Sequence, residues 1–236
     1  MKALRYTPFE HLKCPRPVDK LDWISDFCRD KRVLDLGAFD ETAVALKEGT
    51  DYWLHGRIAA AAKEVVGVDN SELLPAEGLR ASDQSVIVRG DILELGRIHL
   101  DWDPDVVVAG ELIEHLPNAL EFLRLLKADD RFASSTVLLT TPNASAFYNF
   151  VLGLGGREST HHDHVAIHSY KTLNTLCAKV GLSEWDLIPY HSRFSELGLR
   201  SSRLVRLVVT GFERLVNAVE YLFPLVGGGW IVKARL

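Results

Sequence analysis

The sequence predicts an α/β fold with a doubly wound, mostly parallel sheet of seven strands, and two observations support this prediction. Short apolar runs rich in β-branched residues recur along the chain, and segments with helical spacing separate them. The runs are continuous rather than alternating, which is typical of strands buried on both faces of a parallel sheet. Strands that alternate with helices indicate a doubly wound sheet. The five clearest runs are residues 32–37, 64–69, 85–91, 105–110 and 135–142.

Two of the intervening helices have well-marked ends. A helix is predicted over residues 118–128, where Asn118 is the expected N-cap and Glu121 stands three residues later, as in a capping box. A second helix is predicted over residues 169–181, with a serine at its start and Gly181 at its end. Both helices follow a predicted strand, as the doubly wound fold requires.

The remaining segments suggest one domain with an appendage. Residues 184–190 and 227–236 are the expected sixth and seventh strands. We expect residues 1–236 to form a single domain, with residues 1–30 as an N-terminal extension of helix and loop. Residues 196–226, between the last two strands, are expected to form an amphipathic helical appendage.

The appendage combines a broad apolar face with arginines at helical spacing, namely Arg200, Arg203 and Arg206. We expect a pair of helices that covers the substrate pocket as a lid or forms the interface of a homodimer. Peripheral contact with an anionic membrane is an alternative, because arginines flank the apolar face. A third alternative is an arginine stripe that binds a phosphorylated or RNA acceptor.

Composition and charge narrow the classes of function. The net charge of −5 gives no global basic field, so a nucleic-acid partner is not expected. The three cysteines show no C-x-x-C spacing, which argues against a disulfide framework and a structural zinc site. The amino-terminal residues lack the apolar run of a signal peptide, and we therefore expect a cytoplasmic protein.

Small and acidic residues follow the predicted strands at their carboxyl ends, where sheets of this kind bind ligands. Asp35 and Gly37 close the first strand, Asp69 closes the second, and Asp91 follows the third. An acid at the end of the second strand can accept hydrogen bonds from both hydroxyls of a ribose. The sequence therefore predicts a nucleotide-type ligand across these strand ends.

The ordered set VLDLG, VVGVD, RGDI, DVVVAGELIEHLPN and LLTTPN resembles the class I S-adenosylmethionine-dependent methyltransferases. The resemblance covers roughly residues 30–190 and the last strand. It implies a Rossmann-like sheet, S-adenosyl-L-methionine as cofactor, and methyl transfer as the reaction. In that family the glycine after the first strand approaches the methionine part, and the two later acids hold ribose and adenine. The implied cofactor-binding residues are Asp35, Gly37, Asp69, Asn70, Asp91, Ile92 and Gly110.

The first loop departs from the family pattern. Phe39 and Glu41 stand where glycines are usual, so side chains crowd the turn, and residues 48–64 form an extra segment that includes His55. His55 is an outside candidate for the cofactor pocket, although packing is its more common use. A protein that binds the cofactor without catalysis is therefore one alternative. A dinucleotide-binding protein is another, although the loop lacks the G-x-G-x-x-G that a pyrophosphate needs.

The stretch GELIEHLPN places Glu111, Glu114 and His115 at positions i, i+3 and i+4, where their side chains could converge. Together with His164 in the stretch HHDHVAIH, they resemble the metal ligands of methyltransferases with an E-x-x-E-H motif, namely the ubiquinone-pathway, small-RNA 2′-O and sugar O-methyltransferases. A divalent ion, Mg²⁺ or Mn²⁺, is implied as an aid to methyl transfer onto a hydroxyl. A histidine base without a metal, or a purely structural turn, are the alternatives.

Three residues are candidates for the proton acceptor: His115, His162 and Asp163. His161 is a further candidate in the same loop, whereas His168 stands just before a helix and is expected to be structural. We expect an O-methyltransferase that acts on a small molecule, with the hydroxyl of a sugar or glycoside as the first expectation. A phenol or quinol and the ribose of an RNA are the alternative acceptors.

Overall fold

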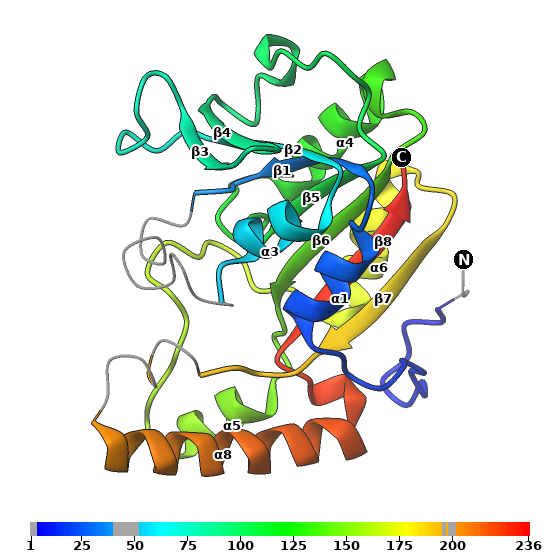
Figure 1. The fold of residues 1–236 in the computed structure, drawn as a ribbon. Coiled ribbons are helices and arrows are strands. Elements are labelled where there is room, and N and C mark those ends of the chain that lie inside the picture. Colours follow the sequence, from blue (N-terminus) through cyan, green and yellow to red (C-terminus); the bar gives the residue numbers. More distant parts are fainter. Residues whose placement is uncertain (1–3, 40–51, 195–196, 198–201) are drawn as a thin grey trace.

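A computed structural model describes residues 4–39, 52–194, 197 and 202–236. The departure at position 41, residues 48–51 of the extra segment and the arginine at position 200 lie outside these described residues. Figure 1 shows a single twisted sheet with helices on both of its faces and one long helix set apart from it.

The sheet has the strand order β3-β4-β2-β1-β5-β6-β8-β7. Its strands are β1 (Arg32–Leu36), β2 (Glu64–Asp69), β3 (Leu79–Ser82), β4 (Ser85–Arg89), β5 (Val106–Gly110), β6 (Thr136–Pro142), β7 (Trp185–Tyr190) and β8 (Gly229–Arg235). Strands β4, β2, β1, β5 and β6 are mutually parallel, whereas β8 runs antiparallel to both β6 and β7. The predicted doubly wound, mostly parallel sheet is confirmed.

The prediction of seven strands was one short. The additional strand β3 pairs antiparallel with β4 through a tight turn, and the register slips between Arg80 and Ser82. Strand β3 has only four residues, none of them fully buried. Because the continuous apolar pattern marks strands covered on both faces, it does not detect a short, half-exposed edge strand.

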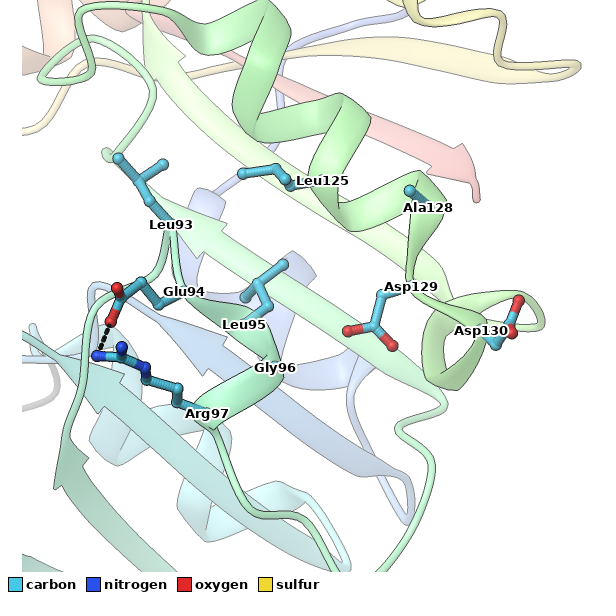
Figure 2. Close-up of a pocket in the computed structure, with 9 residues that line it drawn as sticks. All are labelled: Leu93, Glu94, Leu95, Gly96, Arg97, Leu125, Ala128, Asp129 and Asp130. Atoms are coloured by element: carbon cyan, nitrogen blue, oxygen red, sulfur yellow. Dashed lines mark hydrogen bonds and ion pairs between the residues drawn. The ribbon is translucent and has the colours of Figure 1, made fainter.

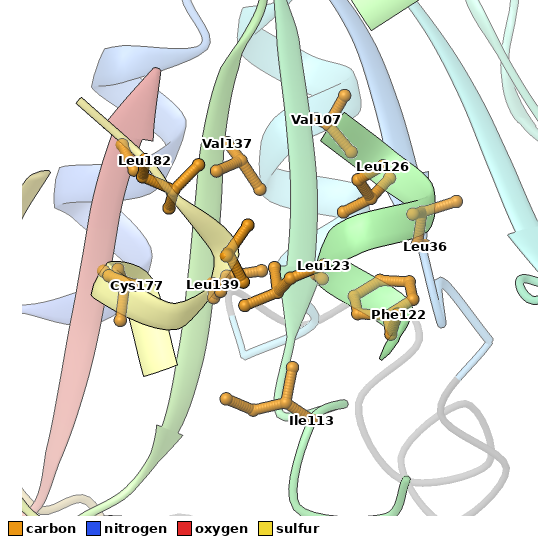
Figure 3. Close-up of a cluster of buried hydrophobic side chains, with 14 of the residues drawn as sticks. Leu36, Val107, Ile113, Phe122, Leu123, Leu126, Val137, Leu139, Cys177 and Leu182 are labelled. Carbon is orange, nitrogen blue, oxygen red and sulfur yellow. The ribbon is translucent and has the colours of Figure 1, made fainter. Parts of the chain in front are cut away.

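The described residues include six α-helices, four of which cover the two faces of the sheet. They are α1 (Lys20–Phe27), α3 (Leu54–Ala61), α4 (Ala119–Ala128), α5 (Phe147–Leu154), α6 (Tyr170–Val180) and α8 (Arg203–Leu222), with short 3₁₀ helices η1 (Leu95–Arg97), η2 (Asp130–Phe132) and η3 (Pro224–Val226). Helices α4 and α6 pack on one face of the sheet, and α1 and α3 pack on the other. Figure 3 shows the larger core, where Phe122, Leu123 and Leu126 of α4 meet Val107 and Leu139 of the sheet.

The predicted N-cap of α4 and both predicted ends of α6 are confirmed, whereas the Glu121 side chain pairs with Arg124 at 4.0 Å instead of completing a capping box. The side chain of Asn118 accepts a hydrogen bond from the Glu121 backbone N–H at 3.1 Å. Ser169 caps α6 in a capping box with Thr172. Gly181 ends α6 with a φ of 77°, a left-handed conformation that glycine adopts without strain.

Two helical segments differ from the prediction. Residues 147–154, for which no helix was predicted, form α5. In the described part of the appendage, residues 203–222 form one helix of 20 residues that Gly211 does not interrupt, and residue 197 is helical as well, whereas residues 196 and 198–201 of the expected pair lie outside the described residues. A single glycine costs a helix only about 1 kcal/mol, which a helix of this length tolerates. No helix in the described part of the chain is both long enough and apolar enough to cross a bilayer.

Candidate functional site

The loops that follow β1, β2 and β4 are tied together by backbone hydrogen bonds. The Gly37 N–H donates to the Val68 carbonyl at 2.8 Å, and the Gly90 N–H donates to the Asp69 carbonyl at 2.8 Å. These two bonds bring the carboxyl ends of the three strands together. The predicted cofactor residues on these loops therefore lie along one edge of the sheet.

Asp69 is oriented by its neighbours at the end of β2. One carboxylate oxygen accepts a hydrogen bond from the Phe39 N–H at 3.0 Å, and the other accepts from the Ser71 N–H at 3.0 Å. The first loop and the second strand thus meet at this carboxylate. An acid held at this strand end has the position that ribose recognition requires.

Gly37 has a left-handed backbone with a φ of 74°, and an added Cβ would lie 3.0 Å from Cδ1 of Leu112. The glycine is therefore required both by conformation and by close packing. At Gly110, an added Cβ would lie 2.6 Å from Cδ2 of Leu54. The space beside Gly110 is thus occupied by a side chain of α3, which limits the ligand contact predicted for this residue.

The remaining predicted cofactor residues have less enclosed positions. The carboxylate of Asp91 accepts a hydrogen bond from the Leu93 N–H at 2.8 Å and remains exposed. Ile92 packs against the larger core, and Asn70 is exposed directly after β2. The roles of Asp91, Ile92 and Asn70 in cofactor binding stay predictions.

Asp35 and His55 belong to the interior rather than to a pocket. The His55 Nδ1 lies 2.8 Å from an Asp35 carboxylate oxygen, its Nε2 lies 2.8 Å from the Ser85 hydroxyl, and all three side chains are buried. The ring of His55 crosses β2 at Gly67, where an added Cβ would lie 2.9 Å from Cε1 of the ring. The outside prediction that His55 lines the cofactor pocket is wrong, because both ring nitrogens are satisfied inside the protein.

Glu111 follows β5 in an unusual conformation, with a φ of 50°. Its Oε1 accepts hydrogen bonds from the Thr140 hydroxyl at 2.7 Å and the Tyr190 hydroxyl at 2.9 Å, and lies 3.1 Å from Nζ of Lys20. Burial alone would raise the pKa of Glu111, but the Lys20 charge and the two hydroxyl donors hold it below its usual range. Glu111 is therefore ionised at neutral pH.

Glu114 has the opposite environment. Its side chain is fully buried, and neither carboxylate oxygen makes a hydrogen bond of normal geometry among the described residues, although the Thr141 hydroxyl is near enough to favour the ionised form slightly. Burial, together with the nearby negative charge of Glu111, raises the pKa of Glu114 to about 8. An isolated carboxylate at this place would be costly, so the group is protonated at neutral pH unless a cation joins it.

The loop that carries His164 is fastened to the turn that carries Glu114. The Val165 N–H donates to the Glu114 carbonyl at 2.8 Å. As a result, one donor atom from each of Glu114, His115 and His164 lies within 4.8 Å of the others. The rings of His115 and His164 meet edge to face, with centroids 4.6 Å apart.

Glu111 lies apart from this three-residue group, which corrects the expectation that all four side chains converge. Residues 111–118 form a series of turns rather than a helix, so the i, i+3, i+4 geometry does not apply. The backbone of Glu111 is left-handed, and its carboxylate oxygen Oε1 points towards Lys20 rather than towards the three-residue group. The structure thus gathers three of the four predicted ligands.

Among the three, His164 has the properties of a neutral ligand. Its Nδ1 is buried without a hydrogen-bond partner among the described residues. Burial, and then the proximity of His115 and His161, lowers the pKa of His164. A neutral imidazole is the form that binds a metal ion.

The other loop residues are more open. His161, His162 and Asp163 form a second, exposed cluster, in which His162 Nε2 lies 3.2 Å from an Asp163 oxygen. Both histidines of the first group approach this cluster, since the ring centroids of His115 and His164 lie 6.1 and 5.6 Å from that of His161. His168, expected to be structural, is joined to Asn143 by an isolated bridge, and burial lowers its pKa. The catalytic roles predicted for His115, His162 and Asp163 remain untested.

Sequence reasoning missed the three partners of Glu111. Tyr190 ends β7 and Thr140 lies in β6 near its carboxyl end, so the strand-end rule could have found both. Lys20, at the start of α1, belongs to the segment treated as an extension and carries no sequence signal for this role. The side chains around Glu111 thus come from three segments that are far apart in the sequence, namely α1, β6 and β7.

A surface depression lies elsewhere, between residues 93–97 and the end of α4. Figure 2 shows its lining, with the ion pair between Arg97 and Glu94 at 2.6 Å and the carboxylate of Asp129 across from it. None of the predicted site residues lines this depression. It therefore has no part in the candidate site.

The sheet order, with its antiparallel penultimate strand β8, and the ligand edge at β1, β2 and β4 together define the Rossmann-like methyltransferase fold. Solved structures that resemble this one include methyltransferases. A comparison with family profiles finds no match for this sequence, and neither does a comparison with curated proteins.

Three solved structures represent this likeness. A SAM-dependent methyltransferase from Archaeoglobus fulgidus is 17% identical with a TM-score of 0.51, over 91% of this chain and 90% of that one. The methyltransferase domain of bacterial CtHen1 is 16% identical with a TM-score of 0.50, over 92% and 98%. The small RNA methyltransferase HEN1 is 17% identical with a TM-score of 0.53, over 96% of this chain but 27% of that one. At these identities the likeness establishes the fold.

Proposed function

We propose that this protein is an S-adenosyl-L-methionine-dependent O-methyltransferase that acts on a hydroxyl of a small molecule. The fold supports methyl transfer, and the strand-end residues Gly37, Asp69 and Asp91 support cofactor binding. The carboxylate of Asp69 would accept the ribose hydroxyls, and the left-handed turn at Gly37 would let the backbone approach the methionine part.

The observation that carries the proposal is the environment of Glu114. A fully buried carboxyl group without a hydrogen-bond partner lies beside two imidazoles, one of which has an unpartnered buried nitrogen. A divalent cation would satisfy these atoms together and would convert Glu114 to its ionised form. The mixed oxygen and nitrogen donors of Glu114, His115 and His164 fit Mn²⁺ or Mg²⁺, with the imidazoles favouring Mn²⁺.

The protein groups around this place suit a hydroxyl acceptor. A bound divalent ion would supply Lewis acidity that lowers the pKa of that hydroxyl. Glu111, ionised and beside Tyr190, is positioned to accept a hydrogen bond from a further hydroxyl of the acceptor. His115 is adjacent to both histidine clusters and is the candidate to take up the released proton.

A sugar or glycoside remains the favoured acceptor, because carboxylates and hydroxyls surround the candidate site and the chain is acidic overall, with a net charge of −5. That same charge disfavours the ribose of an RNA, whose binding would weaken steeply with salt. A phenol or quinol is the remaining acceptor class. Methyl transfer from labelled S-adenosylmethionine to representatives of each class would separate these acceptors from one another and from a protein that only binds the cofactor.

The first test is a calorimetric titration of Mn²⁺ and Mg²⁺ into the protein saturated with S-adenosylhomocysteine. Binding of one ion per chain, lost in Glu114→Gln and kept in the exposed control Glu77→Gln, is the expected result. Binding of equal strength in both variants would refute Glu114 as a ligand. No binding in the unmodified protein would overturn the metal proposal and leave His115 as a base without a metal.

A further inference from the structure

We propose that the outer face of α8, together with α5, binds the surface of an anionic membrane. We define this α8–α5 face by its exposed apolar side chains, which are Leu204, Leu207, Val208, Leu215 and Leu222 of α8 and Phe150 and Leu154 of α5. Each of these side chains is more than half exposed; Leu204 is 77% exposed and Leu154 is 75% exposed.

The apolar side chains of α8 lie on one side of the helix. Leu204 and Val208 stand four residues apart, and Val208, Leu215 and Leu222 recur every seven residues, which places them along one stripe. The opposite side packs inward at Val216 and Glu220, both fully buried. The stripe therefore points away from the protein. A helix surface that faces only water usually carries polar side chains, so an apolar stripe here indicates a binding surface.

The buried side of α8 is held firmly. The carboxylate of Glu220 accepts hydrogen bonds from the Ser192 N–H and its hydroxyl, and lies 3.0 Å from Nδ1 of His191. Arg16 stacks over the ring of Tyr221 at the end of the helix, with its guanidinium carbon 4.6 Å from the centroid. Rotation of α8 to bury its leucines would break these contacts, so the outward stripe is a fixed feature of the fold.

Helix α5 carries further exposed apolar side chains next to α8. It lies alongside α8 and contacts it, as Figure 1 shows, and the two helices project together from one end of the sheet. Phe150 is 64% exposed, and an added Cβ at Gly211 would meet open space.

Charge identifies the partner. On α8, Arg203 and Arg214 are exposed beside the stripe, whereas both acids of the helix face the protein. Arg206 is exposed as well, but it stands seven residues before Glu213, on the side of the helix that carries the acids. Glu213 accepts a hydrogen bond from the Phe194 N–H at 2.7 Å, and Glu220 is buried. The exposed charges of α8 are thus all positive, although the chain as a whole carries −5. Arginines beside an apolar stripe are typical of helices that lie in the headgroup region of anionic bilayers.

A second copy of the chain fits this face less well. A two-fold contact is made by the same patch on both subunits, so the arginines at the edge of the stripe would meet arginines or apolar groups rather than acids. Phosphate and carboxylate headgroups supply the missing negative charge, and acyl chains accept the leucines. The observations therefore favour an anionic lipid surface over self-association.

The proposal is tested by flotation of the full-length protein with vesicles of phosphatidylcholine alone and with added phosphatidylglycerol. We expect binding to the anionic vesicles that weakens as salt is raised, and a loss of about tenfold or more in Leu207→Glu/Leu215→Glu. The double variant Arg203→Gln/Arg214→Gln should weaken anionic binding alone. A matched control, Leu73→Glu, changes a leucine that is 68% exposed elsewhere and should bind like the unmodified protein.

Three outcomes would overturn the proposal. Failure to float with anionic vesicles would refute it, and sedimentation as a dimer would then assign the face to a second copy. Equal binding to neutral and anionic vesicles would refute the role of charge. Equal loss in the Leu73 control would show that the effect is not specific to the α8–α5 face. Because the proposed cofactor site shares no residue with this face, retained S-adenosylhomocysteine binding by the variants separates this proposal from the proposed function.

Discussion

Glu111 and Glu114 lie three residues apart on the same loop, yet at neutral pH the carboxyl group of Glu111 is ionised and that of Glu114 is protonated. Lys20, Thr140 and Tyr190 hold Glu111 ionised, whereas the fully buried Glu114 has no hydrogen-bond partner among the described residues and a pKa of about 8. The charge of Glu111 is itself one cause of the raised pKa of Glu114. The pair thus presents one fixed negative charge and one carboxyl group that a cation could ionise.

The first prediction concerns stability without metal. Glu114 keeps its proton up to about pH 8 in the folded state but would lose it near 4.5 when unfolded, so the folded state binds the extra proton between these values. The stability that this group contributes is fully present below pH 4.5 and is lost as pH rises towards 8. In EDTA, Glu114→Gln should therefore gain stability relative to the unmodified protein between pH 5 and 8, by about 3 kcal/mol. Urea unfolding at several pH values measures this difference, and parallel pH profiles would contradict it.

The second prediction concerns the pH dependence of metal binding. Because the ion must displace the proton of Glu114, Mn²⁺ affinity should rise by about tenfold per pH unit between pH 6 and 7.5, with about one proton released. Calorimetry in buffers of different ionisation enthalpy counts that proton. Affinity independent of pH over this range would show that Glu114 is ionised before the ion arrives.

A third prediction tests the cofactor site. Asp69→Asn keeps the size of the side chain but removes the charge that would bind the ribose hydroxyls, so S-adenosylhomocysteine should bind about tenfold more weakly. Asp83→Asn, in the turn between β3 and β4, is the matched control and should bind normally. Circular dichroism checks that the loop contact from Phe39 has not unfolded the variant. Unchanged affinity in Asp69→Asn would remove this residue from the site.

A fourth prediction concerns the interior. In Gly67→Ala, the new Cβ would lie 2.8 Å from the Ala38 Cβ and 2.9 Å from Cε1 of His55. Overpacking should lower the free energy of unfolding by about 2 kcal/mol. Gly96→Ala is the matched control, because an added Cβ there meets nothing within 4 Å. Thermal unfolding compares the two, and equal stability would mean that the His55 ring can move aside.

Local patterns in the sequence were enough to predict seven of the eight strands and the ends of the best-marked helices. Continuous apolar runs mark strands buried on both faces, and a cap such as Ser169 or a left-handed Gly181 is determined within a few residues of the chain. The acids at the strand ends follow from the same patterns, since parallel strands end at one edge. Strand β3 and helix α5 escaped prediction, because neither has buried side chains in a pattern that a core imposes.

The sequence by itself was sufficient to predict the fold class and to single out Glu111, Glu114, His115 and His164 as candidate site residues. Tertiary structure decided how these groups are used, since contacts between distant segments have no local sequence signal. A backbone bond from Val165 to Glu114 brings His164 to the buried carboxyl group. Lys20, more than ninety positions before Glu111, fixes the charge of that residue. The physical reason is that a buried helix or strand requires apolar residues at regular intervals, and this pattern can be seen in the sequence. The pKa values and the ligand geometry instead depend on which loops meet in space.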